Sequence, residues 1–158
     1  MTKEEFEIKY NKYFDMLFRV AYRYVKNAYE AENIVQDVFI KLYLKNKQFK
    51  DESHEKYYLL RLVINRSIDY IRHNKSQNLS LDNEYVNNVP DNTNKQDEDI
   101  YNCVCLLGDN YKTIIILYYY ENINLKEIAS VLKISYGNAK VRLNRAREEL
   151  KKIIEERR

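Results

Sequence analysis

Turn-forming residues are scarce along this chain, and their scarcity limits the folds that it can adopt. The 158 residues include two glycines and one proline, the residues that most often break helices and build tight turns. Long stretches instead carry apolar residues at the three- and four-residue spacing of amphipathic helices. The sequence therefore predicts an all-α protein.

Formal charge divides the chain into three segments. Residues 1–75 and 101–158 each carry a net charge of +4, whereas residues 76–100 carry −5 and are rich in Asn, Asp and Ser. The middle segment offers few side chains that could form a core. We expect two small helical domains, residues 1–75 and 100–158, joined by a flexible acidic linker over residues 76–99. This layout suits two nucleic-acid-binding modules, although acidic linkers are also simply soluble linkers.

Residues 124–147 have the pattern of a helix-turn-helix. Asn124 can cap a short amphipathic helix, and Glu127 can reach back to the Asn124 N–H to complete a capping box. After a turn of two or three residues, Ser135 can cap a second, longer helix. Between positions 133 and 147 this stretch holds five basic residues and no acidic one. A one-signed helical face of this size fits a DNA major groove.

The charge of this helix does not by itself establish DNA binding. Basic helical faces are commonly solvated surfaces of ordinary bundles, and charge alone favours that interpretation. The joint spacing of short helix, turn and capped basic helix matches known docking geometry and favours duplex DNA.

Two earlier helices carry polar faces that could also bind partners. The helix expected from Asn27 to Lys45 has an acidic and amide face, for which the pattern alone favours simple solvation. The next helix, expected to start near Ser53 or His54, is apolar on two sides and must be covered by both earlier helices. Its narrow polar band begins at an aromatic pair that could stack on unpaired bases or could equally be core residues.

Other classes of protein receive little support from the sequence. There is no charged-then-apolar leader and no apolar run long enough to span a bilayer, so we expect a cytoplasmic protein without membrane insertion. No glycine-rich phosphate loop or Ser/His/Asp set indicates an enzyme or a cofactor. Cys103 and Cys105 lie far in sequence from His54 and His73, which favours packed thiols over a metal site.

Three blocks in this order resemble the extracytoplasmic-function sigma factors of bacterial RNA polymerase: AYEAENIVQDVF, KYYLLRLVINRSIDYIR and NLKEIASVLKISYGNAKVRLNRARE. The likeness covers nearly the whole chain. It implies that the first domain holds core RNA polymerase and opens the promoter −10 element, while the second reads the −35 element as duplex. The implied partners are core polymerase, through its clamp coiled coil and flap, promoter DNA and an anti-sigma factor.

The resemblance also implies roles for individual residues. The face that docks on the polymerase clamp would be Glu32, Asn33, Gln36 and Asp37. The candidates for the −10 element are Tyr57, Tyr58, Arg61, Asn65, Asp69 and Arg72. The candidates for the −35 element are Tyr136, Asn138, Lys140, Val141, Arg142, Asn144, Arg145 and Arg147. Of these, Arg142 and Arg147 are expected on phosphates or in helix packing.

The sequence departs from the family pattern at three positions. Lys133 stands in the turn where the family often has Gly, so a residue with a Cβ has to adopt a left-handed conformation. Tyr58 stands where many members carry Trp, and Val141 replaces the small polar residue usual in the recognition helix. The last departure bears on promoter specificity.

Two other functions remain open at this point. A polymerase-independent regulator would use the same C-terminal motif as a dimer on a palindrome. A helical adaptor would bind only protein through its first domain. The regulator predicts tight binding of a specific duplex by the isolated chain, whereas the sigma interpretation predicts weak DNA binding until polymerase is present.

Overall fold

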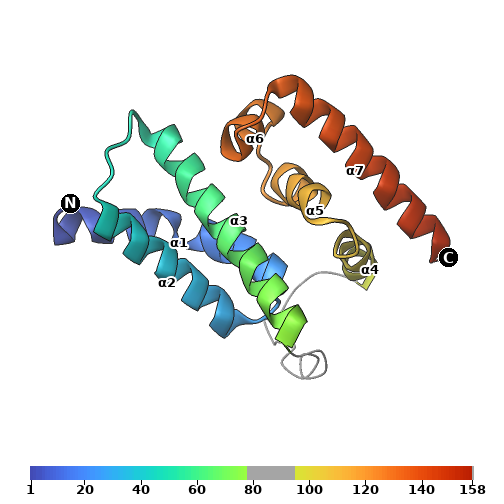
Figure 1. Ribbon diagram of the computed structural model, residues 1–158, viewed down its shortest axis with the longest axis horizontal. Coiled ribbons are helices and arrows are strands. Elements are labelled where there is room, and N and C mark those ends of the chain that lie inside the picture. Colours follow the sequence, from blue (N-terminus) through green and yellow to red (C-terminus); the bar gives the residue numbers. More distant parts are fainter. Residues whose placement is uncertain (78–94, 158) are drawn as a thin grey trace. The chain divides into compact units, whose positions relative to one another are not determined.

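The computed structural model describes residues 1–77 and 95–157, and it contains no strand in those ranges. The chain divides into two compact units, Met1–Val89 and Pro90–Arg158. Both units are built from helices (Figure 1). The prediction of an all-α protein with two helical domains is confirmed.

The N-terminal unit is a bundle of three helices, α1 (Lys3–Val25), α2 (Ala28–Lys45) and α3 (Glu52–Gln77). Each helix packs against the other two, as the two-sided apolar pattern of α3 predicted (Figure 1). Leu17, Phe39 and Leu59 contribute fully buried side chains from the three helices. The bundle therefore leaves one face each of α2 and α3 available to partners.

Polar contacts fasten the start of α3 to α1. The Glu55 side chain is buried, accepts a hydrogen bond from Tyr13 Oη at 3.2 Å, and lies 2.5 Å from Lys9 Nζ. Burial and the adjacent Glu55 carboxylate raise the pKa of Tyr13 to about 12. Lys12 also pairs with Glu52. These contacts hold the first turn of α3 against α1.

The beginning of α3 differs from the prediction. The helix begins at Glu52, because Asp51 Oδ1 accepts a hydrogen bond from the His54 N–H at 3.0 Å and so caps it. The position before a helix favours a short side chain that accepts hydrogen bonds, such as that of Asp. The prediction did not consider Asp51 as the cap. Further along, Leu62, Ile68 and Ile71 are only half-buried, so the bundle covers less of α3 than the apolar pattern implied.

Ser67 in the middle of α3 provides a test of the bundle's packing. Its side chain is fully buried, and its Oγ has no hydrogen-bond partner among the described residues. An unpaired buried hydroxyl is unfavourable and Ala is the better helix former, so Ser67→Ala should raise the free energy of unfolding by about 0.5–1 kcal/mol. Urea unfolding checks this, with exposed Ser53→Ala as the matched control. A loss of stability would show that the hydroxyl is bonded within the fold.

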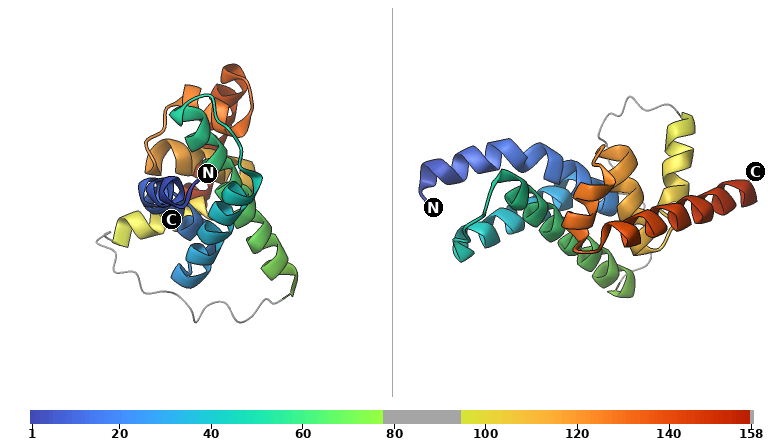
Figure 2. Two further views of the ribbon diagram at one scale, coloured as in Figure 1. Left: turned by 90° about the vertical axis from the view of Figure 1, so that its left-hand side faces the viewer. Right: turned by 90° about the horizontal axis from the view of Figure 1, so that it is seen from above.

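The C-terminal unit contains α4 (Lys95–Val104), α5 (Asp109–Ile115), a π-helical turn (Ile116–Tyr120), α6 (Leu125–Leu132) and α7 (Tyr136–Glu156). The long helix α7 packs on α4, α5 and α6 (Figures 1 and 2). Its core includes Ile114, Leu117, Ile128 and Leu143. Cys103 is buried and Cys105 is half-buried in this unit.

The predicted linker, residues 76–99, needs correction at both ends. Residues 76–77 belong to α3, and the last five residues belong to α4, which begins at Lys95 rather than at Ile100. Asp97 and Glu98 lie in the first turn of α4, where carboxylates favour a helix by interacting with its dipole. The rest of the predicted linker, residues 78–94, lies outside the described residues. In the described ranges, none of the helices has both the length and the apolar character that crossing a bilayer requires.

Candidate functional site

The helix-turn-helix forms largely as predicted. Asn124 caps α6 by accepting a hydrogen bond from the Glu127 N–H at 2.9 Å, and Ser135 caps α7 by accepting from the Asn138 N–H at 3.0 Å. The Glu127 carboxylate meets the Asn124 side chain, accepting from Nδ2 at 2.8 Å, where the prediction had the backbone N–H. Each helix of the motif therefore begins at its own side-chain cap.

Lys133 adopts the left-handed conformation predicted for the turn, with φ 57° and ψ 46°. A Cβ makes this conformation unfavourable, so Lys133→Gly should raise the free energy of unfolding by about 0.5–1 kcal/mol. Thermal unfolding checks this. Lys133→Ala is the matched control, because it removes the same charge and keeps the Cβ. Equal gains in both variants would mean that the charge, and not the backbone, matters at this position.

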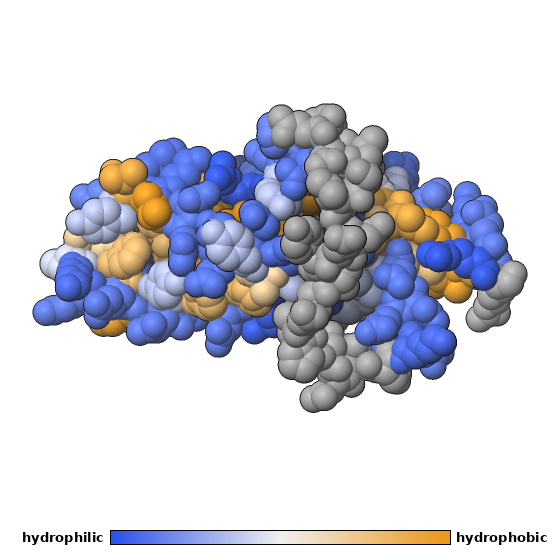
Figure 3. Space-filling model, turned by 90° about the horizontal axis from the view of Figure 1, so that it is seen from below, coloured by the Kyte–Doolittle hydropathy of each residue, from blue (hydrophilic) through white to orange (hydrophobic). Residues whose placement is uncertain are grey.

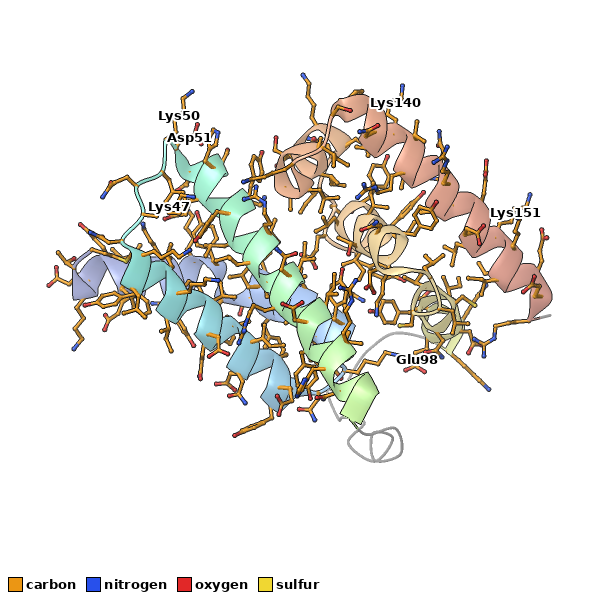
Figure 4. The ribbon with its side chains drawn as sticks, in the orientation of Figure 1. Lys47, Lys50, Asp51, Glu98, Lys140 and Lys151 are labelled. Carbon is orange, nitrogen blue, oxygen red and sulfur yellow. The ribbon has the colours of Figure 1, made fainter. Side chains whose placement is uncertain are left out.

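Helix α7 separates a packing face from an open face. Ala139, Leu143 and Ala146 are buried as predicted, while Leu150 is half-buried. Of the residues predicted to contact the −35 element, only Arg142 is half-buried, and the others are exposed: Tyr136, Asn138, Lys140, Val141, Asn144, Arg145 and Arg147. Lys140 and Lys151 project from the outer side of the helix (Figure 4). The structure therefore brings the predicted reading residues onto one accessible helix.

Arg147 contacts two aromatic side chains of its own unit. Its Nε donates a hydrogen bond to Tyr119 Oη at 2.6 Å, and its guanidinium lies 5.5 Å from the ring centre of Tyr118. These contacts agree with the expectation that Arg147 takes part in helix packing. Helical periodicity gives no sign of these partners, because they precede Arg147 by 28 and 29 residues.

The polar band of α3 holds the six residues predicted for unpaired bases. Asn65, Asp69 and Arg72 are exposed and follow one another at helical spacing, while Tyr57, Tyr58 and Arg61 are half-buried. Partial burial lowers the pKa of Arg61, although the nearby Tyr58 opposes this shift. The band thus passes from an aromatic, partly buried end to an open polar end.

The loop before α3 adds two residues that the sequence analysis did not single out. The Phe49 ring lies 5.3 Å from the Tyr58 ring, and Lys47 Nζ lies 4.4 Å from the Tyr58 ring centre. Figure 4 shows Lys47, Lys50 and Asp51 on this loop. The sequence signal for this surface was Phe49, an aromatic residue among lysines in a polar segment. Aromatic and cationic side chains together suit nucleic-acid binding.

The polar face of α2 is accessible, and its side chains pair both with one another and with α3. Glu32, Gln36 and Asp37 are exposed and Asn33 is half-buried. Gln36 Nε2 donates to Glu32 Oε1 at 3.3 Å, and Asp37 Oδ2 lies 2.6 Å from Arg66 Nη2 of α3. The four predicted docking residues therefore share one open helical face.

Exposed apolar side chains continue this face toward the end of α2. Ile40 and Leu44 expose 53% and 75% of their surface. Together with Asp37, Lys41, Leu62 and Arg66 they line an open groove between α2 and α3. Figure 3 shows apolar side chains, in orange, at the surface of the N-terminal unit. The sequence analysis placed no binding role on these two residues.

Two family models match the chain, one for each unit. Sigma-70 region 2 matches residues 10–77, and sigma-70 region 4 matches residues 97–150. The ECF RNA polymerase sigma factor SigW of Bacillus subtilis is 32% identical, with 89% of this chain and 83% of SigW covered. SigM of the same organism is 27% identical, with 91% of each chain covered.

Solved structures share the fold. The sigma factor RpoE of Bartonella quintana, in complex with the anti-sigma factor NepR, matches with a TM-score of 0.70 at 20% identity, covering 96% of this chain and 98% of RpoE. CnrH, in complex with the cytosolic domain of CnrY, matches with a TM-score of 0.69 at 17% identity, covering 98% of this chain and 90% of CnrH.

Proposed function

Since the chain belongs to the extracytoplasmic-function sigma factors of bacterial RNA polymerase, we propose that its two units recognise different elements of one promoter. As a member of this family it directs core RNA polymerase to promoters and initiates transcription there. The observation that carries the proposal is the open face of α7, which has donors of one charge sign on a capped helix-turn-helix.

The C-terminal unit is the reader of the −35 duplex in this proposal. Lys140, Asn144 and Arg145 project from the exposed side of α7 and can donate to base edges in the major groove. Tyr136 and Val141 add apolar contacts, and Asn138 lies near the capped start of the helix. The half-buried Arg142 contacts DNA phosphates or takes part in helix packing. We expect affinity for DNA to fall steeply with added salt.

The N-terminal unit captures unpaired bases of the −10 element. Tyr57 and Tyr58 supply aromatic surface, Arg61 a partly buried charge, and Asn65, Asp69 and Arg72 supply polar contacts. Lys47 and Phe49 extend this surface onto the loop, since both contact Tyr58. Stacking of each base contributes about 1–3 kcal/mol, which offsets the cost of unstacking the duplex.

Core polymerase docks on the α2 face made by Glu32, Asn33, Gln36 and Asp37. The exposed Ile40 and Leu44 lie beyond this face, so a polar contact region adjoins an apolar one. The clamp coiled coil is the proposed receptor for this face, and the flap receives the C-terminal unit.

We further expect an anti-sigma factor, because one solved structure of this fold is RpoE in complex with the anti-sigma factor NepR, and another is CnrH in complex with the cytosolic domain of CnrY. Sigma factors are DNA-binding initiation factors, and we expect the chain itself to catalyse no reaction and to act in the cytoplasm. The chemistry of RNA synthesis remains with the polymerase.

Co-purification of the tagged chain with core RNA polymerase, followed by transcription in vitro from a pool of promoter sequences, tests the proposal. Stable association and transcripts with defined start sites are expected, and the enriched sequences identify both promoter elements. No association, together with tight binding of the isolated chain to one duplex, would indicate a polymerase-independent regulator. Absence of both results would indicate an adaptor.

A further inference from the structure

Three consecutive tyrosines, Tyr118, Tyr119 and Tyr120, lie in the π-helical turn that follows α5. The wide turn is closed by hydrogen bonds from the Glu121 N–H to Ile116 O and from the Ile123 N–H to Leu117 O, both 3.0 Å. Because a π-helical turn rotates less per residue than an α-helix, neighbouring side chains can face the same partner. Tyr118 and Tyr119 both contact α7 in this way.

The partner of both rings is Arg147. Its guanidinium carbon lies 5.5 Å from the centre of the Tyr118 ring and 5.6 Å from that of Tyr119, and the two rings meet edge to face. The hydrogen bond from Arg147 Nε to Tyr119 Oη is 2.6 Å long and sets the orientation of the planar guanidinium. Two rings and one hydroxyl thus hold a long side chain that would otherwise sample many rotamers.

The held guanidinium reaches a residue of the reading face. Arg147 Nη1 donates a hydrogen bond to Asn144 Oδ1 at 3.4 Å, one helical turn earlier on α7. With Oδ1 engaged, the Asn144 amide turns its Nδ2 group away from Arg147. Asn144 is exposed, so this group is available to a ligand.

We propose that Arg147 is a positioning residue that orients Asn144, and that Asn144 therefore reads hydrogen-bond acceptors in the −35 major groove. The inference rests on the proposed function of α7. Guanine offers two acceptors, N7 and O6, thymine offers O4 and adenine offers N7, whereas cytosine offers only a donor. Asn144 thus selects against cytosine at its position, and Tyr119 supports this selection through Arg147.

The test uses the full chain bound to core RNA polymerase and transcription from a promoter pool with a randomised −35 element. Asn144→Ala should remove the preference at one base position. Arg147→Ala should reduce the preference at the same position about three- to tenfold, and Tyr119→Phe, which keeps the ring, should have a smaller effect there. The double variant Asn144→Ala with Arg147→Ala should equal Asn144→Ala alone at that position, since residues acting in series are not additive.

Salt dependence separates positioning from a phosphate contact. If Arg147 positions Asn144, Arg147→Ala should leave the slope of log affinity against log salt unchanged. A slope smaller by about one, with equal loss across all promoter sequences, would assign Arg147 to a phosphate and overturn the inference. If Asn144→Ala instead removes a preference for cytosine, the inference is also overturned.

Two controls keep the outcomes distinct. Thermal unfolding of each variant identifies any general loss of structure, and Tyr119→Phe alone decides the question if Arg147→Ala fails to fold. If the unmodified chain gives no promoter-specific transcript, the proposed function fails and this inference falls with it. If the unmodified chain is specific and Tyr119→Phe and Arg147→Ala keep its full preference, only this inference is wrong.

Discussion

Replacing Asp37 with Arg should lower the affinity of the chain for core RNA polymerase by at least about thirtyfold. A charge reversal within a complementary interface typically costs several kcal/mol, because an attraction is lost and a repulsion is created. Asp37 belongs to the proposed α2 docking face, and its side chain is half exposed. Competitive co-purification, or titration of labelled chain with core polymerase, measures the change.

The ion pair between Asp37 and Arg66 makes a second variant informative. Both side chains are about half exposed, so the pair contributes no more than about 1 kcal/mol to folding stability. Arg66→Ala should therefore fold normally, and by freeing the Asp37 carboxylate it should bind polymerase equally well or more tightly. Asp15→Arg makes the same charge change at an exposed position on α1 and should bind normally. Unchanged binding of Asp37→Arg would remove this face from the docking site.

Replacing Arg145 with Ala should reduce promoter binding by about 1–3 kcal/mol and relax selection at one −35 position. Arg145 is exposed on α7, so its guanidinium is free to form the paired hydrogen bonds that guanine accepts through O6 and N7. Transcription from a pool with a randomised −35 element measures both effects together.

Lys151→Ala is the matched control for Arg145→Ala. Lys151 projects from the same helix, six residues beyond Arg145 (Figure 4). As a phosphate contact it should weaken all promoters alike and lower the salt slope by about one. If Arg145→Ala instead behaves as Lys151→Ala is expected to, then Arg145 contacts the backbone and another residue reads the base.

Much of the secondary structure could be predicted because its signals are local. Asn124 and Ser135 lie directly before apolar-periodic runs, and each caps a helix as predicted. Asn27 caps α2 in the same way. The left-handed turn at Lys133 was predicted from the resemblance, since the family often has Gly at that position. The start of α4 was placed five residues late because the polar composition around Asp97 and Glu98 outweighed their helix-start signal.

The accessible residues of the candidate site also follow from periodicity. Once Ala139, Leu143 and Ala146 are assigned to the core, the exposed positions of α7 are largely determined by helical geometry. The roles of those positions came from the resemblance, because a donor on a helix does not by itself distinguish a base from a phosphate or from water.

The sequence by itself determined the helices, their caps and the two-part organisation, since each depends on neighbours within a few positions along the chain. Only the tertiary structure decided which polar residues meet. Arg147 contacts Tyr119, which lies 28 positions away, and Asp37 pairs with Arg66, which lies 29 positions away. Tyr58 contacts Phe49 and Lys47 of the preceding loop. Such pairs depend on how helices cross and on a π-helical turn that redirects side chains. Neither the crossing of helices nor the π-helical turn can be predicted from periodicity along the chain.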